Sequence, residues 1–318
     1  MIYQPGSRIL YGCGHQNTSR RRHKVCGYSF LFALLLSSSL VFAQNPGSNT
    51  EPINLLIRCD DIGMNHAVNE ATKQLLESGL TISTSVMFAC PWYQEAVEIL
   101  KRYPNVSVGV HLTLNAEWKH YRWGPVLGAA AVPSLVDSNG YFFPTRASLF
   151  ANKPRREEVE QELRAQIQRS VRSGLRIDYL DYHMGAAVTT LELREVVEKL
   201  AGEFGLGISR YFGEEDVPGV YRASVETKKD TLLAAVRRLQ PGAVQLLVNH
   251  IGLETSEMNT LVDMNQTGLP EMSKHRHAEL RALLSPEFRS LILERGIKLV
   301  TYRDLIRERG LDAMKRPE

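Results

Sequence analysis

Short apolar segments alternate with amphipathic segments along most of the chain, which is the pattern of strands followed by helices. The first apolar run, residues 55–57, leads into Asp60 and Asp61, and Gly63 then turns the chain into a helical repeat over residues 67–76. Further strands are predicted at residues 81–88, 106–111, 177–180, 208–211, 244–248 and 297–300. About seven strands, mostly followed by helices, predict an α/β fold, namely a distorted seven-stranded (β/α) barrel.

The alternation stops between residues 115 and 153, where a long insertion is rich in aromatic residues, glycine and proline. Within it, the sequence Asp-Ser-Asn-Gly at residues 137–140 predicts the turn of a small hairpin. Long loops of this kind are more often functional than not. We therefore expect the insertion to contribute to a site.

Composition narrows the class of protein. The chain has 318 residues, 43% hydrophobic and 23% charged, as in ordinary globular proteins, and this length allows one large α/β barrel or two small domains. The net charge of +3 is slight, and much of the excess lies in residues 20–24, so no basic stripe remains to bind nucleic acid. No GxGxxG motif or P-loop follows the first strand, which gives nucleotide binding little support.

The N-terminal region has the pattern of an export signal. A basic cluster at residues 20–24 precedes a mostly apolar run at 28–42, and Val41 and Ala43 fit a signal-peptidase site after Ala43. A membrane helix is the alternative, but the run is short and polar, turn-forming residues follow it. We predict a periplasmic or secreted protein without a membrane anchor after cleavage. The expected divisions are an extension and signal peptide at 1–43, a linker at 44–52, a barrel at 53–310 and a tail at 311–318.

Only two cysteines, Cys59 and Cys90, follow the predicted cleavage site. Export would permit a disulfide between them, and two buried thiols are an equal expectation. Nothing in their spacing resembles a cysteine-based zinc site.

Five polar residues fall at or just after the ends of predicted strands: Asp60, Asp61, His111, His183 and His250. The carboxyl ends of parallel neighbouring strands meet at one mouth of a barrel, so these side chains should converge. Singly, each has an ordinary explanation, because a histidine can be a hydrogen-bonded structural residue and an aspartate a helix N-cap. Asp178 and Asp181 could likewise be helix N-caps. Five such residues at successive strand ends nevertheless predict a metal site.

Two imidazoles and one carboxylate suit zinc or another divalent first-row ion, with open positions for water. Magnesium prefers more oxygen ligands and ranks lower, although it or another divalent ion stays open. A divalent ion lowers the pKa of bound water and polarises a neighbouring carbonyl group. The second carboxylate of the pair can then take the proton from that water.

Four motifs at these positions resemble, in order and spacing, the YdjC-like carbohydrate deacetylases: Asp60-Asp61-Ile62-Gly63, Gly109-Val110-His111-Leu112, Asp181-Tyr182-His183-Met184-Gly185 and His250. Residues 133–137 and 296–305 look like the family too, and the similarity covers about residues 54–305. The resemblance implies a distorted βα barrel that uses one divalent metal ion to hydrolyse an N-acetyl group on a sugar.

The resemblance also implies roles. Asp61, His111 and His183 would be the metal ligands, and Asp60 the general base, by analogy with the paired aspartates of NodB-type polysaccharide deacetylases. His250 would lie where the family has a histidine and would donate a proton to the departing amine.

The chain departs from the common family pattern at a few positions: Cys59 replaces the usual Asn, Ile62 replaces the usual Phe, Ile251-Gly252 follow His250, and Met184-Gly185 follow the third ligand. These departures leave the three implied ligands in place.

We therefore expect an exported metal-dependent deacetylase whose partner is an N-acetylated sugar or oligosaccharide; a homodimer is left open. Trp118, Tyr121 and Trp123 of the insertion are predicted to stack on sugar rings, with packing under the loop as the equal alternative. Two other functions compete with this one. One is a metal-dependent hydrolase of another amide or an ester, and the second is a non-catalytic periplasmic sugar-binding protein. The retained Asp60 argues against a pure binder, which needs no base.

Overall fold

The computed structural model describes residues 51–317. The predicted signal peptide, its cleavage site after Ala43 and almost all of the predicted linker lie outside these residues. None of the helices in the part of the chain that the structure describes is long and apolar enough to cross a membrane.

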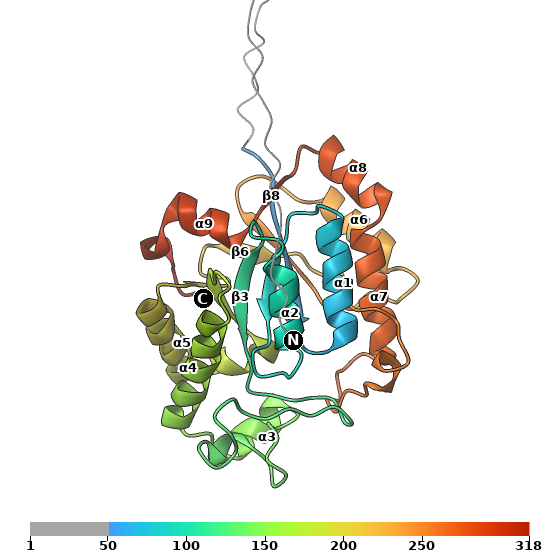
Figure 1. The fold of residues 1–318 in the computed structure, drawn as a ribbon. Coiled ribbons are helices and arrows are strands. Elements are labelled where there is room, and N and C mark those ends of the chain that lie inside the picture. The colour runs from blue at the N-terminus through green and yellow to red at the C-terminus, as the bar shows by residue number, and fades with distance from the viewer. Residues whose placement is uncertain (1–50, 318) are drawn as a thin grey trace, which may run out of the picture. The chain divides into compact units, whose positions relative to one another are not determined.

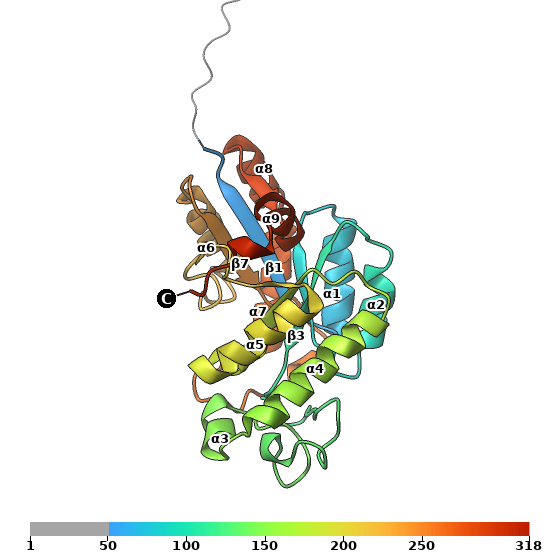
Figure 2. The same cartoon turned by 90° about the vertical axis from the view of Figure 1, so that its left-hand side faces the viewer.

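One parallel sheet organises the described residues, and its strands follow the order β5-β4-β3-β2-β1-β7-β6. The strands are β1 Asn54–Ile62, β2 Ser83–Val86, β3 Ser107–Leu112, β4 Tyr179–Tyr182, β5 Gly207–Ile208, β6 Glu214–Asp216, β7 Val244–Asn249 and β8 Lys298–Val300. The short β8 lies off this path and pairs with the start of β1. The seven-stranded path curls into a half-barrel, which confirms the predicted barrel-like α/β fold (Figures 1 and 2).

Helices surround this sheet and follow most of its strands (Figure 1). They are α1 His66–Glu77, α2 Tyr93–Leu100, α3 Arg146–Ala151, α4 Arg156–Arg172, α5 Leu191–Phe204, α6 Lys228–Arg237, α7 Met272–Leu283, α8 Pro286–Glu294 and α9 Tyr302–Arg309. Helix α1 packs against α2 and α7, α4 lies beside α5, and α6 contacts α7 and α8. In Figure 2, α4 and α5 run side by side across the face of the sheet.

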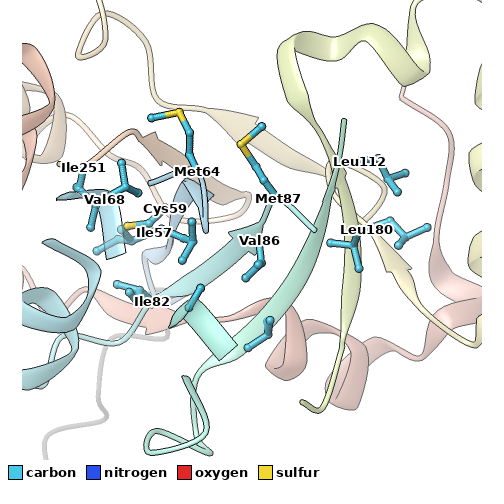
Figure 3. Packing of buried hydrophobic residues seen from close by; sticks show 14 of the residues in the cluster. Ile57, Cys59, Met64, Val68, Ile82, Val86, Met87, Leu112, Leu180 and Ile251 are labelled. Carbon is cyan, nitrogen blue, oxygen red and sulfur yellow. The ribbon is translucent and has the colours of Figure 1, made fainter. Parts of the chain in front are cut away.

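Strand β1 is buried on both faces, which explains its nearly continuous apolar sequence. Because side chains alternate along a strand, Ile57 and Cys59 enter the main core, where Figure 3 shows them near Val68 of α1. On the opposite face, Leu56 packs in a smaller apolar cluster with Tyr179 and other residues. Arg58 and Asp60 continue this second face toward the strand end, so that face changes from apolar to charged along β1.

The aromatic-rich insertion after β3 contains the 3-10 helix η1 Pro133–Leu135 and helix α3. The predicted turn is confirmed, because the Tyr141 carbonyl accepts a hydrogen bond from the Asp137 N–H at 2.8 Å and the Asp137 carbonyl accepts one from Gly140 at 2.9 Å. Of the two expectations for the cysteines, the structure shows free, buried thiols at Cys59 and Cys90.

Candidate metal centre and active site

Three of the five predicted site residues converge at the carboxyl ends of the parallel strands β1, β3 and β4. Asp61 Oδ1 lies 3.3 Å from His111 Nε2 and 3.2 Å from His183 Nδ1. The two ring nitrogens are themselves 3.3 Å apart. All three side chains are almost completely buried. The sequence separated these residues by up to 122 positions, and the parallel sheet brings them together because each lies at or next to a strand end.

Backbone turns in the left-handed region direct these side chains. Asp61 has a φ of 63°, which is uncommon for a residue other than glycine, and Gly63 follows at 87°. His183 comes directly after β4, and the chain then turns through Met184 and Gly185 with φ values of 52° and 69°. Such conformations persist where the surrounding structure holds them and are frequent at functional sites.

Each histidine has a carboxylate on the ring nitrogen that faces away from Asp61. Asp181 Oδ2 lies 2.8 Å from His111 Nδ1, and Glu117 Oε2 lies 2.9 Å from His183 Nε2. The first pair follows from the register of β3 and β4, where His111 and Asp181 are direct neighbours. Asp181 is therefore a partner of a site histidine and not a helix N-cap, whereas Glu117 comes from the insertion.

Asp60 points to a different partner from Asp61. Its two carboxylate oxygens accept hydrogen bonds from Nε and Nη2 of Arg58, at 2.7 and 2.8 Å. The same guanidinium contacts Asp181 Oδ1 at 2.9 Å, so one buried arginine joins Asp60 to the carboxylate that contacts His111. One oxygen of Asp60 also lies within 4.8 Å of a ring nitrogen of His111.

Arg276 of α7 is a site residue that the sequence did not reveal. Its Nη2 donates a hydrogen bond to Asp61 Oδ2 at 2.6 Å, across 215 positions of the chain. Burial raises the pKa of Asp61, but the charge of Arg276 and the nearby rings of His111 and His183 outweigh burial and hold the pKa of that carboxyl well below its usual range. Asp61 is therefore ionised, with one oxygen on Arg276 and the other facing the two imidazoles.

The carboxylates raise the pKa of both imidazoles. Burial lowers the pKa of His111, but the charges of Asp181 and Asp60, the hydrogen bond that the ring donates to Asp181 and the nearby carboxylate of Asp61 outweigh it and raise the pKa to about 9. Burial acts in the same direction on His183, and Glu117 and Asp61 raise its pKa to about 10. In the metal-free protein both rings therefore carry a second proton at neutral pH.

His250 follows β7 and lines the same cavity as Asp61, His183 and Arg276. Its backbone N–H donates to Glu279 Oε2 at 2.6 Å, and its ring contacts the ring of Tyr221 edge-on, with centroids 5.3 Å apart. Nδ1 of His250 has no hydrogen-bond partner among the described residues. The structure thus brings His250 to the cavity, outside the cluster of Asp61, His111 and His183.

The cavity beside these residues has a volume of about 440 Å³. Of the three predicted stacking residues, Trp118 lines it, although its side chain is only 1% exposed and its Nε1 donates to Met64 Sδ at 3.3 Å. Trp123 is buried and donates to the Asn115 carbonyl at 2.9 Å, and the Tyr121 hydroxyl donates to the Met64 carbonyl. All three side chains thus pack within the insertion, and their stacking on a sugar stays a prediction.

The cluster of Asp61, His111 and His183 fits a divalent metal ion. Asp61 Oδ1 is a buried carboxylate oxygen with no good hydrogen-bond partner in the described residues, and it faces two imidazole nitrogens. The potential donor atoms lie within 4.8 Å of one another. One carboxylate with two imidazoles is a donor set for zinc or another first-row ion.

Comparison with known proteins agrees with the resemblance found in the motifs. The model of the family described as YdjC-like protein matches residues 54–294. A carbohydrate deacetylase of Enterococcus faecalis is 30% identical over 262 residues, covering 79% of this chain and 97% of the relative. A carbohydrate deacetylase of Brevibacillus brevis is 28% identical over 272 residues, covering 80% and 100%.

The fold has a relative among solved structures as well. A proposed cellobiose-phosphate cleavage protein of Enterococcus faecalis superposes with a TM-score of 0.65 at 27% identity, covering 80% of this chain and 99% of that chain. The family model spans most of the described residues and includes every predicted site residue. The chain therefore belongs to the YdjC-like protein family.

Proposed function

We propose that the protein is a metal-dependent hydrolase that removes the N-acetyl group from a sugar and releases acetate and the free amine. The observation that carries this proposal is the convergence of Asp61 Oδ1, His111 Nε2 and His183 Nδ1 beside an open cavity. The names of the relatives from Enterococcus faecalis and Brevibacillus brevis support the choice of a sugar as substrate.

Asp61, His111 and His183 would hold one divalent ion, with zinc favoured by the ligand types. When bound there, the ion would lower the pKa of a water molecule and polarise the acetamide carbonyl group. Arg276 contacts Asp61, and the carboxylates of Asp181 and Glu117 contact His111 and His183.

Asp60 would take the proton from the attacking water. The water oxygen then bonds to the acetamide carbon, and the bond between that carbon and the nitrogen breaks when the tetrahedral intermediate collapses. Arg58 contacts both oxygens of Asp60, and such a bidentate pair fixes the orientation of the carboxylate. A general base needs a fixed orientation toward the proton that it removes.

His250 is the proposed donor of the proton that the departing amine requires. Its ring lines the cavity and contacts the ring of Tyr221 edge-on, and histidine is the side chain that most often transfers protons in active sites. The competing role is purely structural. A His250→Gln variant with the wild-type kcat would remove His250 from the mechanism.

The experiment that tests the reaction class is acetate release from a panel of compounds. The panel contains N-acetylated monosaccharides and oligosaccharides, the matching O-acetyl esters, and acetylated amines without a sugar. Release from the N-acetyl sugars above the other two groups supports the proposal. Preference for the esters or the simple amides would establish another hydrolase, and saturable sugar binding without acetate release would establish a binding protein.

A further inference from the structure

We propose that Glu117 of the insertion is a positioning residue that fixes the ring of His183 with Nδ1 toward Asp61, so that the insertion completes the metal site. This inference rests on the proposed metal site. It assigns a role to a residue outside the strand ends, in a segment where the sequence offered only aromatic residues as candidates.

The contact between Glu117 and His183 is short and buried. Oε2 of Glu117 lies 2.9 Å from Nε2 of His183, and the two side chains are 5% and 6% exposed. A neutral imidazole has one N–H and one nitrogen lone pair. In the neutral ring that would hold a metal ion, a carboxylate acceptor at Nε2 therefore keeps the hydrogen on Nε2 and leaves the lone pair on Nδ1, which is the nitrogen that faces Asp61 Oδ1 at 3.2 Å.

The other histidine has the mirrored arrangement. Asp181 contacts Nδ1 of His111, which leaves Nε2 facing Asp61 Oδ1 at 3.3 Å. The two rings thus present opposite nitrogens to Asp61, and each has its own carboxylate on the far side. Glu117 has the same relation to His183 that Asp181 has to His111, although one carboxylate comes from a strand and the other from a loop.

Backbone hydrogen bonds from within and outside the insertion hold the segment around Glu117 in place. The neighbouring Ala116 N–H donates to the Phe143 carbonyl at 3.0 Å, and the carbonyl of Glu117 accepts a hydrogen bond from Met264 at 2.9 Å. On another side of the His183 ring lies Trp123, with ring centroids 6.1 Å apart. The insertion therefore contacts His183 through one carboxylate and one aromatic ring.

Three variants separate the parts of this contact. Glu117→Ala removes the acceptor, Glu117→Asp keeps the charge but shortens the reach by one methylene group, and Glu117→Gln keeps an acceptor oxygen at full reach. The measurement is zinc affinity of the metal-stripped protein, by competition with a chromogenic chelator. The absorption spectrum of the cobalt-substituted protein reports the ligand geometry.

Glu162 provides the matched control. It is completely buried in α4, and its two oxygens accept hydrogen bonds from the Val126 and Leu127 N–H groups, at 2.9 and 3.1 Å. Glu162→Ala and Glu162→Gln therefore loosen the same insertion without touching His183.

We expect Glu117→Ala and Glu117→Asp to lower zinc affinity by about 10- to 100-fold and to change the cobalt spectrum, because partners of metal-bound histidines have effects of this size. Glu117→Gln should recover most of the affinity, and the two Glu162 variants should bind zinc like the wild type. Wild-type affinity and spectrum in Glu117→Ala would overturn the proposal, as would an equal loss in the Glu162 variants. If Glu117→Ala does not fold, the comparison of Glu117→Asp with Glu117→Gln decides alone.

This test is independent of the substrate. Zinc binding that depends on Glu117 in a protein that deacetylates no sugar would contradict the proposed function and leave the role of Glu117 intact. A wild-type protein that binds neither zinc nor cobalt would overturn the metal site and this inference together.

Discussion

At the scale of single residues, the two adjacent aspartates have separate surroundings. Asp60 lies on the Arg58 face of β1, whereas the positive φ of Asp61 turns its carboxylate toward His111, His183 and Arg276. Arg58 thus binds the carboxylate of Asp60, and Arg276 binds that of Asp61. These two ion pairs reduce the repulsion that two neighbouring buried charges would otherwise have. The separation of partners is the physical basis for assigning two different roles to the pair.

Conservative changes at the two aspartates test that assignment. Asp60→Asn should keep its bound metal and lose turnover by about 10²- to 10⁴-fold, the usual cost of removing a general base. Asp61→Asn should lose the metal, because the oxygen facing the two histidines would no longer be charged. Metal content and kcat are measured on both variants. The opposite pattern would exchange the roles, and equal metal loss would make the pair joint ligands.

The raised pKa values of the two histidines predict that metal binding releases protons. With pKa values of about 9 for His111 and about 10 for His183, both rings are doubly protonated at pH 7 without metal. A metal ion needs one lone pair from each ring, so its binding should displace about two protons at pH 7. Because protons compete with the ion, affinity should rise with pH until it passes these pKa values.

Zinc titrations by calorimetry, in buffers of different ionisation enthalpy, measure this release. Binding without proton release at pH 7 would show that the imidazoles are already neutral in the metal-free protein.

Sequence periodicity was informative at residues on strands and uninformative elsewhere. Asp60, Asp61, His111 and His183 could be predicted because each ends a strand, and alternation along β1 would also have placed Arg58 on the face of Asp60. Arg276 lies on a helix far along the chain, and Glu117 lies in an irregular loop, so no repeat connects either to the site. Only the packing of the folded chain reveals their partners.

At the scale of elements, the apolar strands were predicted and the polar ones were not. Strand β6 has the sequence Glu-Glu-Asp and is mostly exposed, so it lacks the alternation that identifies a half-buried strand. In helix α7, which begins at Met272, buried polar residues such as His275 and Arg276 obscure the apolar face. Tertiary contacts, not local pattern, fix these two elements.

Gly109 of β3 illustrates how closely the strands pack beneath the site. A Cβ atom at this position would lie 2.5 Å from the ring of Tyr179. That side chain is completely buried, and its hydroxyl forms a hydrogen bond with Ser85 Oγ at 2.9 Å. Because that ring cannot move freely, Gly109→Ala should lower the free energy of unfolding by about 1–3 kcal/mol, the typical cost of overpacking.

Chemical denaturation measures this change, with Gly202→Ala in α5 as the matched control. No atom lies within 4 Å of a Cβ at Gly202, and alanine is the better helix former, so this variant should gain up to about 1 kcal/mol. Unchanged stability in Gly109→Ala would mean that the Tyr179 ring has room to shift.

At the scale of the whole molecule, the half-barrel brings the site residues to one edge of the sheet, and the insertion adds Glu117 and Trp118 from outside the strands. The family pattern predicted this architecture because its motifs fall at strand ends. The contribution of the insertion could not be predicted, since it depends on how a loop without periodicity folds back over His183.

Export of the protein, with cleavage after Ala43, is a further prediction for the whole chain. It rests on the basic cluster, the apolar run and the small residue at the cleavage site. Mass spectrometry of the protein isolated from separated cell fractions measures both location and N-terminus. A mature chain beginning at Gln44 outside the cytoplasm is expected, and a cytoplasmic chain with an intact N-terminus would contradict export.

Acetate release from an N-acetylated sugar, recorded together with the metal content of the same sample, tests the proposed metal-dependent deacetylation most directly. We expect release by the metal-loaded protein, loss of release after a chelator removes the ion, recovery when zinc is restored, and no recovery in His111→Ala. Acetate release at an unchanged rate from protein shown to be free of metal would contradict the account. So would a metal-loaded protein that releases acetate from none of the N-acetylated sugars.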